Sequence, residues 1–110
     1  MAITKSKLFE KDQVRIAAFA KALSHPARIA ILQILALQKS CICGDITNQL
    51  PLAQSTVSQH LKALKSAGII KGEIDGPRTC YCINGEVLSE LKSEIDNLLI
   101  ELTTINKNCC

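Results

Sequence analysis

The sequence predicts a mainly α-helical single domain with one small β-hairpin, and three patterns support this fold class. Residues 51–68 place apolar side chains at helical spacing beside a wide polar surface. Residues 69–83 change to two short β-like runs separated by a strong turn signal. Residues 84–106 then repeat apolar side chains alternately three and four positions apart, which is typical of a helix that packs along another helix.

Length and composition exclude several classes of protein. A chain of 110 residues buries one core, and its hydrophobic content of 47% argues against disorder. Aromatic residues are only 3%, so stacking on single-stranded nucleic acid is poorly supported, while a net charge of +3 permits nucleic-acid binding without requiring it. Because no apolar run reaches membrane length and residues 1–13 lack the apolar core of a secretory signal, we expect a cytoplasmic protein with no membrane partner.

The first half of the chain predicts three helices. Residues 8–23 gather apolar side chains among charged ones, as an amphipathic helix does. Pro26 suits the first turn of a second helix over residues 27–38, which is apolar nearly all round and is therefore expected in the core. A short third helix is expected from near Cys41 to Leu50.

The helix that ends at Gly68 combines two chemistries. Val57, Leu61 and Leu64 form a narrow apolar stripe, and the other faces carry hydroxyls, amides and lysines that suit base edges and phosphates. With the preceding short helix and turn, this makes a helix-turn-helix over residues 41–67, whose second helix enters the DNA major groove. An ordinary amphipathic surface helix is the alternative, and the flanking segments favour the DNA-binding interpretation.

A β-hairpin, or wing, is predicted directly behind this helix over residues 69–83, with Arg78 at its tip placed to touch a phosphate or the minor groove. A winged helix-turn-helix of five helices plus a β-wing uses every predicted element. The expected DNA-facing residues are Gln54, Ser55, Thr56, Ser58, Gln59, Lys62, Lys65 and Arg78.

The last predicted helix, residues 84–106, begins at Asn84, a good capping residue. Its apolar seam consists of Leu88, Leu91, Ile95, Leu98, Leu102 and Ile105. Such a seam favours a partner helix, although it could pack on its own domain instead. We therefore expect a homodimer through residues 8–23 and 84–106, which would present two DNA-reading helices roughly 34 Å apart to a palindromic double-stranded operator.

Six cysteines in a cytoplasmic chain should be mostly thiols, which points to metal, metalloid or redox chemistry. On a strand, Cys80 and Cys82 would share one face with Tyr81 on the other. Cys41 and Cys43 would diverge by about 200° on a helix, so they could share an ion only if Cys41 lies in an extended lead-in.

If the segment before the third helix pairs with the returning wing strand, the two Cys-x-Cys pairs converge. They would then form a site of three or four thiolates suited to As(III), Sb(III), Cd(II) or Zn(II). Simple core packing of these small residues is the alternative. Cys109 and Cys110 rank lower as candidate ligands, since a chain end can carry them without structure.

Four stretches resemble the ArsR/SmtB metalloregulatory repressors, and the similarity runs roughly from Ala17 to the last helix. They are LSHPARIAILQIL (23–35), CICGDI (41–46), QSTVSQHLKALKSAGII (54–70) and the hairpin ending in TCYCI (79–83). The resemblance implies a dimeric winged-helix repressor that leaves its operator when a thiophilic metal, a metalloid or a sulfur oxidant engages protein ligands, with no cofactor required for folding. It also implies that His60 lies in or beside the groove, as a packing or phosphate-contacting residue rather than a metal ligand.

The chain departs from the family pattern at two places. Many members hold the inducer by Cys-Val-Cys-Asp, whereas aligning Asp45 with that acid puts the family cysteines on Ile42 and Gly44. Aligning the cysteines instead requires an inserted residue. The zinc-sensing branch uses a His on the last helix, and residues 84–106 contain none.

The sequence has no constellation for catalysis, so we do not expect an enzyme. A thiol redox or reactive-sulfur sensor of the same fold is the alternative to a metal sensor. A heptad-driven interaction protein without a DNA role is a further class, against which the polar helix argues.

Overall fold

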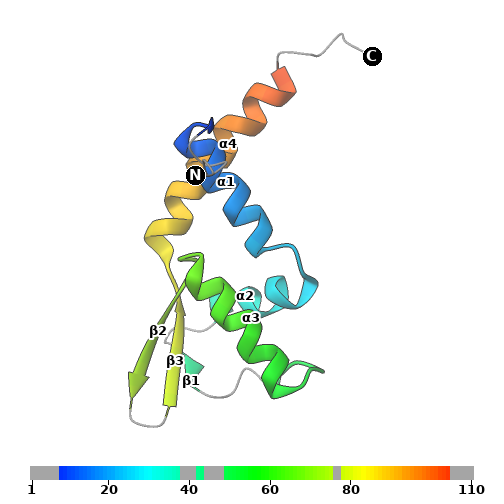
Figure 1. The fold of residues 1–110 in the computed structure, drawn as a ribbon, viewed down its shortest axis with the longest axis vertical. Coiled ribbons are helices and arrows are strands. Elements are labelled where there is room, and N and C mark those ends of the chain that lie inside the picture. Colours follow the sequence, from blue (N-terminus) through cyan, green and yellow to red (C-terminus); the bar gives the residue numbers. More distant parts are fainter. Residues whose placement is uncertain (1–7, 38–41, 44–48, 76–77, 105–110) are drawn as a thin grey trace, which may run out of the picture.

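The computed structural model describes residues 8–37, 42–43, 49–75 and 78–104, and only the backbone at 42–43, 73–75 and 78–79. Its elements in chain order are α1 (Lys11–Ala22), α2 (Pro26–Leu37), β1 (Ile42–Cys43), α3 (Gln54–Ser66), β2 (Ile70–Asp75), β3 (Arg78–Ile83) and α4 (Gly85–Thr104) (Figure 1). The predicted fold class, a mainly helical domain with a small antiparallel hairpin, is confirmed.

The core lies where α2 and α3 pack on each other and on the start of the wing. The predicted stripe of α3, Val57, Leu61 and Leu64, is buried. It packs with Ile31 and Leu35 of α2, so one face of α2 lies in the core as predicted, whereas Ile29 and Leu37 of the same helix are exposed. Ala22, Ile69 and Ile70 complete the buried cluster.

The sheet has the strand order β1-β3-β2 and is antiparallel throughout. Tyr81 and Ile83 of the central strand pack against the core. Because side chains alternate along a strand, Cys80 and Cys82 lie on the opposite face, away from that core. The predicted separation of Tyr81 from the two cysteines is therefore confirmed.

One predicted element is wrong at its start. Residues 42–43 form β1 and pair with Tyr81 and Cys80 of β3, so the expected third helix does not begin near Cys41. Pairing with β3 satisfies backbone groups that a helix would otherwise bond internally. Residues 38–41 and 44–48 lie outside the described part of the chain, in which four helices rather than five are present.

A tight connection joins α3 to the wing. Gly68 adopts the left-handed conformation, with φ of 79°, as its position in the sequence predicts. Its amide donates to the carbonyl of Lys65 at 2.9 Å, and the amide of Ile69 donates to the carbonyl of Leu64 at 3.1 Å. These two bonds form a Schellman motif, which satisfies carbonyls that the end of a helix leaves open. Ile69 and Leu64 are both fully buried beside it.

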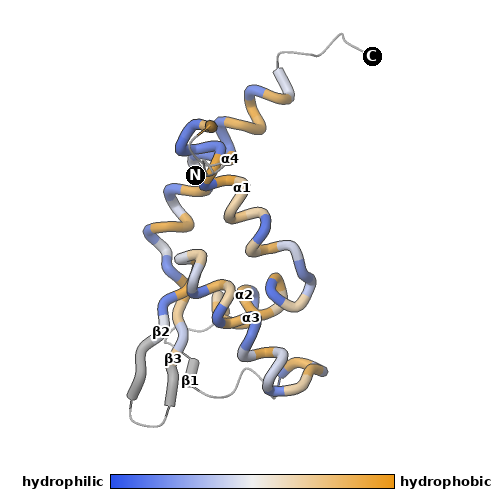
Figure 2. Tube along the Cα trace, viewed as in Figure 1, coloured by the Kyte–Doolittle hydropathy of each residue, from blue (hydrophilic) through white to orange (hydrophobic). Residues whose placement is uncertain are grey.

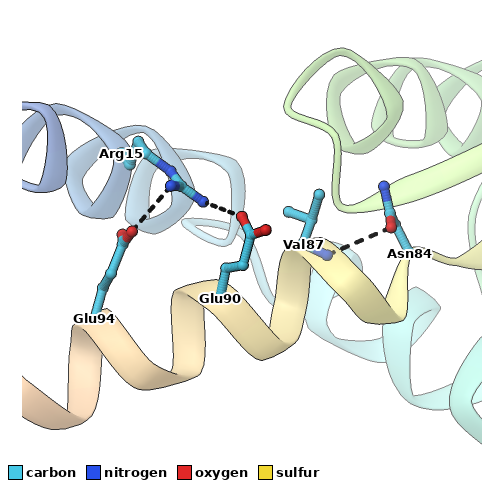
Figure 3. Close-up of polar contacts among 5 residues, drawn as sticks. All are labelled: Arg15, Asn84, Val87, Glu90 and Glu94. Carbon is cyan, nitrogen blue, oxygen red and sulfur yellow. Dashed lines mark hydrogen bonds and ion pairs between the residues drawn. The ribbon is translucent and has the colours of Figure 1, made fainter.

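Helices α1 and α4 lie together, apart from the α2–α3 pair (Figure 1). The Arg15 guanidinium of α1 bridges Glu90 and Glu94 of α4, each at 2.9 Å (Figure 3). Asn84 caps α4, as predicted, because its Oδ1 accepts from the amide of Val87 at 3.5 Å. The molecule is elongated, 53 × 40 × 25 Å.

The apolar seam of α4 divides into two parts. Leu91 is only 5% exposed because its own chain covers it, so little of its side chain is left for a second subunit to contact. Leu88, Ile95 and Leu98 are half-buried, and Ile105 lies outside the described residues. Leu102 is 62% exposed, together with Leu99 at 51%. No helix among the described residues is long and apolar enough to cross a membrane.

We expect Gly68→Ala to lower the free energy of unfolding by about 1–2 kcal/mol, because a Cβ disfavours the left-handed conformation. Urea denaturation followed by circular dichroism measures this change. Gly85→Ala is the matched control: Gly85 opens α4 with open space around it, so alanine there should be neutral or slightly stabilising. Equal losses in both variants would contradict a specific role for the backbone at Gly68.

Candidate nucleic-acid interface

The outward surface of α3 is polar, basic and free of acidic residues. Its exposed residues are Gln54, Ser55, Ser58, Gln59, Lys62 and Lys65, while Thr56 is half-buried. Hydroxyl and amide groups supply both donors and acceptors for base edges, and the lysines supply phosphate contacts. The arrangement follows from the narrowness of the buried stripe, which leaves most of the helix circumference facing solvent.

The beginning of α3 also favours a phosphate. Ala53 is the N-cap residue and provides no side-chain cap, so the first backbone amides of α3 are not satisfied in that way. Open amides at a helix N-terminus, together with the helix dipole, attract anionic oxygen atoms. Ser55, in the first turn, adds a hydroxyl donor at the same end.

Lys65 lies where α3 meets the wing. A Cβ at Gly72 of β2 would sit 3.3 Å from the Nζ atom of Lys65 and 3.1 Å from the ring of Tyr81. The missing side chain of Gly72 therefore makes room for both groups. Lys65 consequently places its charge over the base of the wing, whereas Lys62 is the lysine nearer the middle of α3. The side chain of Arg78 lies outside the described part of the chain.

The sequence predicts His60 in or beside the DNA groove, as a packing or phosphate-contacting residue. Its side chain is only 8% exposed and belongs to the core face of α3. Nδ1 accepts a hydrogen bond from Nε of Arg28 at 3.1 Å, and the ring lies 4.5 Å from the ring of His25. Burial lowers the pKa of His60 below its ordinary value of 6.5, and His25 and Arg28 lower it further. The alternative role as a helix-packing residue fits this geometry.

The cysteines are brought together only in part. Cys43 is the register partner of Cys80, as expected if the lead-in pairs with the returning wing strand. The expectation of thiols does not hold for Cys80 and Cys82, which are both disulfide-bonded. No cluster of three or more His, Cys, Asp or Glu residues able to hold a metal ion occurs within the described ranges. Cys41, Cys109 and Cys110 lie outside those ranges.

The sequence patterns did not predict the roles of two sets of residues. Arg28 emerges as the partner of His60, and its signal was a lone charge on a helix that is otherwise apolar nearly all round. Leu99 extends the exposed apolar surface of α4 beside the predicted seam, and Leu8 and Phe9 are exposed just before α1. A count of apolar residues on neighbouring helix faces, rather than on a single heptad seam, would have found Leu99.

A polar helix behind a turn, followed at once by an antiparallel wing, defines a winged helix-turn-helix DNA-binding protein. The family model described as bacterial regulatory protein, arsR family, matches residues 25–71. The HTH-type transcriptional regulator YgaV of Escherichia coli is 33% identical over 96 residues, covering 87% of this chain and 97% of that protein. The chain belongs to the ArsR family of transcriptional regulators and is not an enzyme.

One further relative agrees with this family, and one solved structure agrees with the fold. The arsenical resistance operon repressor of Bacillus subtilis (strain 168) is 36% identical over 92 residues, which is 83% of each chain. A solved homodimeric winged helix-turn-helix DNA-binding domain from Mycobacterium bovis, a possible ArsR-family regulator, has a TM-score of 0.62 with 24% identity. It covers 100% of this chain and 95% of its own, and it supports the fold.

Proposed function

We propose that this regulator is a homodimeric repressor that binds a palindromic operator through α3. It leaves the operator when its wing cysteines bind a thiophilic metal or metalloid or, in the second candidate, when they are oxidised. The exposed polar surface of α3 is the observation that carries the DNA-binding part. Gln54, Ser55, Ser58 and Gln59 face solvent beside the buried stripe, so they can contact base edges without any rearrangement of the core. Lys62, Lys65 and the open N-terminus of α3 would hold phosphates on either side.

The exposed apolar surface at the α1–α4 end supports a homodimer. Leu99 and Leu102 are exposed on α4, and Leu8 and Phe9 are exposed next to α1. Apolar and polar residues alternate along α4 up to its end (Figure 2). An exposed stripe of this kind is more stable against a second copy than in water, and the solved Mycobacterium bovis relative is homodimeric.

A thiophilic metal or metalloid is the inducer that we propose, with As(III), Sb(III), Cd(II) and Zn(II) as candidates. Cys80 and Cys82 share the outer face of β3, and Cys43 stands opposite Cys80 in the register. Thiolates are the donors that such ions prefer. The Bacillus subtilis relative is named an arsenical resistance operon repressor, which supports this class of inducer. Because disulfide sulfur atoms are not thiolates, Cys80 and Cys82 must first be reduced.

A thiol redox sensor is the second candidate, and the disulfide-bonded state of Cys80 and Cys82 favours it. Two thiols and one peroxide give one disulfide and two waters, while a dithiol reductant returns the two electrons and two protons. A disulfide that ties β3 to another segment would restrain the wing relative to α3. In this candidate the oxidation state, rather than a metal, would set the operator affinity.

Replacing Ser58 and Gln59 by alanine should weaken operator binding by about 2 kcal/mol or more, roughly thirtyfold, because contacts to base edges are lost. Fluorescence anisotropy measures this loss on a duplex that the wild-type chain selects from a randomised library. Gln33→Ala/Ser93→Ala, at exposed positions of α2 and α4, is the matched control and should bind like wild type. An unchanged affinity in the Ser58/Gln59 variant would show that α3 does not read the bases.

Leu99→Glu/Leu102→Glu should convert a dimer into a folded monomer, because charges in an apolar interface lose their hydration. Sedimentation velocity gives the oligomeric state, and circular dichroism verifies the helices. Ile100→Glu is the matched control, since Ile100 is 59% exposed but lies about 100° round the helix from Leu99. A wild-type chain that sediments as a monomer would contradict the dimer.

Anaerobic titration of the reduced protein with As(III), Cd(II) and Zn(II) should produce a sulfur-to-metal absorption band that Cys80→Ser/Cys82→Ser abolishes. The control Cys109→Ser/Cys110→Ser should keep the band. Operator release measured in the same samples links the binding to function. If no band forms and release instead follows peroxide with loss of titratable thiols, the metal proposal fails and the redox sensor stands.

A further inference from the structure

A polar cluster holds three helices together on the inner side of α3. Arg28 extends from α2, and its Nε atom donates to Nδ1 of His60 on α3 at 3.1 Å. Its Nη1 atom donates to the carbonyl oxygen of Ala22, the last residue of α1, at 3.2 Å. One guanidinium therefore fixes the distance from α2 to both the end of α1 and the middle of α3.

His25 completes the cluster from the turn between α1 and α2. Its Nδ1 atom accepts from the amide of Ala27 at 3.1 Å, which fixes the ring at the start of α2. That ring meets His60 with centroids 4.5 Å apart and planes at 48°. His60 is thus held from two sides, by a hydrogen bond from Arg28 and by ring contact with His25.

The chemistry of this contact requires a neutral His60. Because Nδ1 accepts a hydrogen bond, the ring proton sits on Nε2. Burial and the nearby His25 and Arg28 lower the pKa of His60, which keeps the ring in the accepting form. Nε2 is buried and has no hydrogen-bond partner among the described residues. A histidine at this core position leaves a buried donor unsatisfied, which a leucine would not.

We propose that Arg28 and His60 are positioning residues for DNA binding, which set the rotation of α3 about its own axis. This inference rests on the proposed role of α3 in reading the operator. Apolar side chains such as Leu61 and Leu64 hold α3 in place but tolerate small rotations, whereas a hydrogen bond has a preferred direction. Gln59 directly precedes His60 on α3. A rotation of α3 about its axis that moves His60 would therefore also turn Gln59 away from the base edge that it is proposed to contact.

Through Arg28, the α1–α4 pair, which is the proposed dimer interface, is also linked to α3, the proposed DNA-binding helix. The carbonyl of Ala22 belongs to α1, which Arg15 fastens to α4. Arg28 then carries that constraint to His60 on α3. In a dimer built on α1 and α4, this side chain would then help to set the spacing and direction of the two α3 helices.

The test separates positioning from packing with two substitutions at His60. His60→Asn keeps an acceptor close to the place of Nδ1, whereas His60→Leu fills the pocket and removes the acceptor. The probes are the duplex that wild type selects from a randomised library and a scrambled duplex of the same length. Anisotropy gives both affinities, and thermal unfolding confirms that each variant is folded at the assay temperature.

We expect His60→Leu to remain folded at the assay temperature, yet to bind the selected duplex roughly tenfold or more weakly, because the guanidinium of Arg28 loses its partner. Binding to the scrambled duplex should change less than twofold, since phosphate contacts tolerate rotation. His60→Asn should recover most of the specific affinity. Arg28→Gln, which acts from the other side of the bond, should repeat the loss of His60→Leu.

A specific affinity that is unchanged in folded His60→Leu and Arg28→Gln would overturn the inference. Equal losses on both duplexes would overturn it as well, because they would indicate general damage to the fold. If wild type selects no preferred duplex, the proposed function fails first and the inference falls with it. The outcome at the selection step therefore distinguishes the two failures.

Discussion

The packing of the narrow apolar stripe of α3 against α2 is the interaction on which the rest of this structure depends. Val57, Leu61 and Leu64 bury their side chains against Ile31 and Leu35, and each fully buried aliphatic side chain contributes on the order of 1.5–3 kcal/mol. Because the stripe is narrow, the same helix can present hydroxyls, amides and lysines over most of its surface. Stability and recognition therefore use separate faces of one element.

The parts of the fold that follow from local patterns were predictable. Helical spacing predicts α3 and its buried stripe, and the turn residues 75–77 predict the hairpin that pairs β2 with β3. Gly68 is predictable for the same reason, since the end of an apolar period next to a glycine indicates a left-handed helix terminus. Alternation along β3 likewise separates Tyr81 from Cys80 and Cys82.

Features that depend on distant partners were not predictable in detail. β1 has only two residues and forms because it pairs with β3, and two residues are too few to show a strand-like periodicity in the sequence. Arg28 and His60 are 32 positions apart, and their hydrogen bond follows from the crossing of α2 over α3. Leu91 repeats at the seam spacing in the same way as Leu102, but only the tertiary structure decides that Leu91 is covered by its own chain.

The backbone hydrogen bonds at Ile69 fix α3, the wing and α4 relative to one another, and this bears on the proposed binding to DNA. The amide of Ile69 is bonded to the last turn of α3, and its carbonyl accepts from the amide of Asn84 at 2.9 Å, where α4 begins. Ile69 therefore connects α3, the start of the wing and the start of α4 through backbone hydrogen bonds, without a flexible linker between them. α3 and the base of the wing are therefore fixed relative to each other, so the docking on DNA proposed above would lose little conformational entropy. Association can then proceed at a rate set by electrostatic steering, without a slow ordering step.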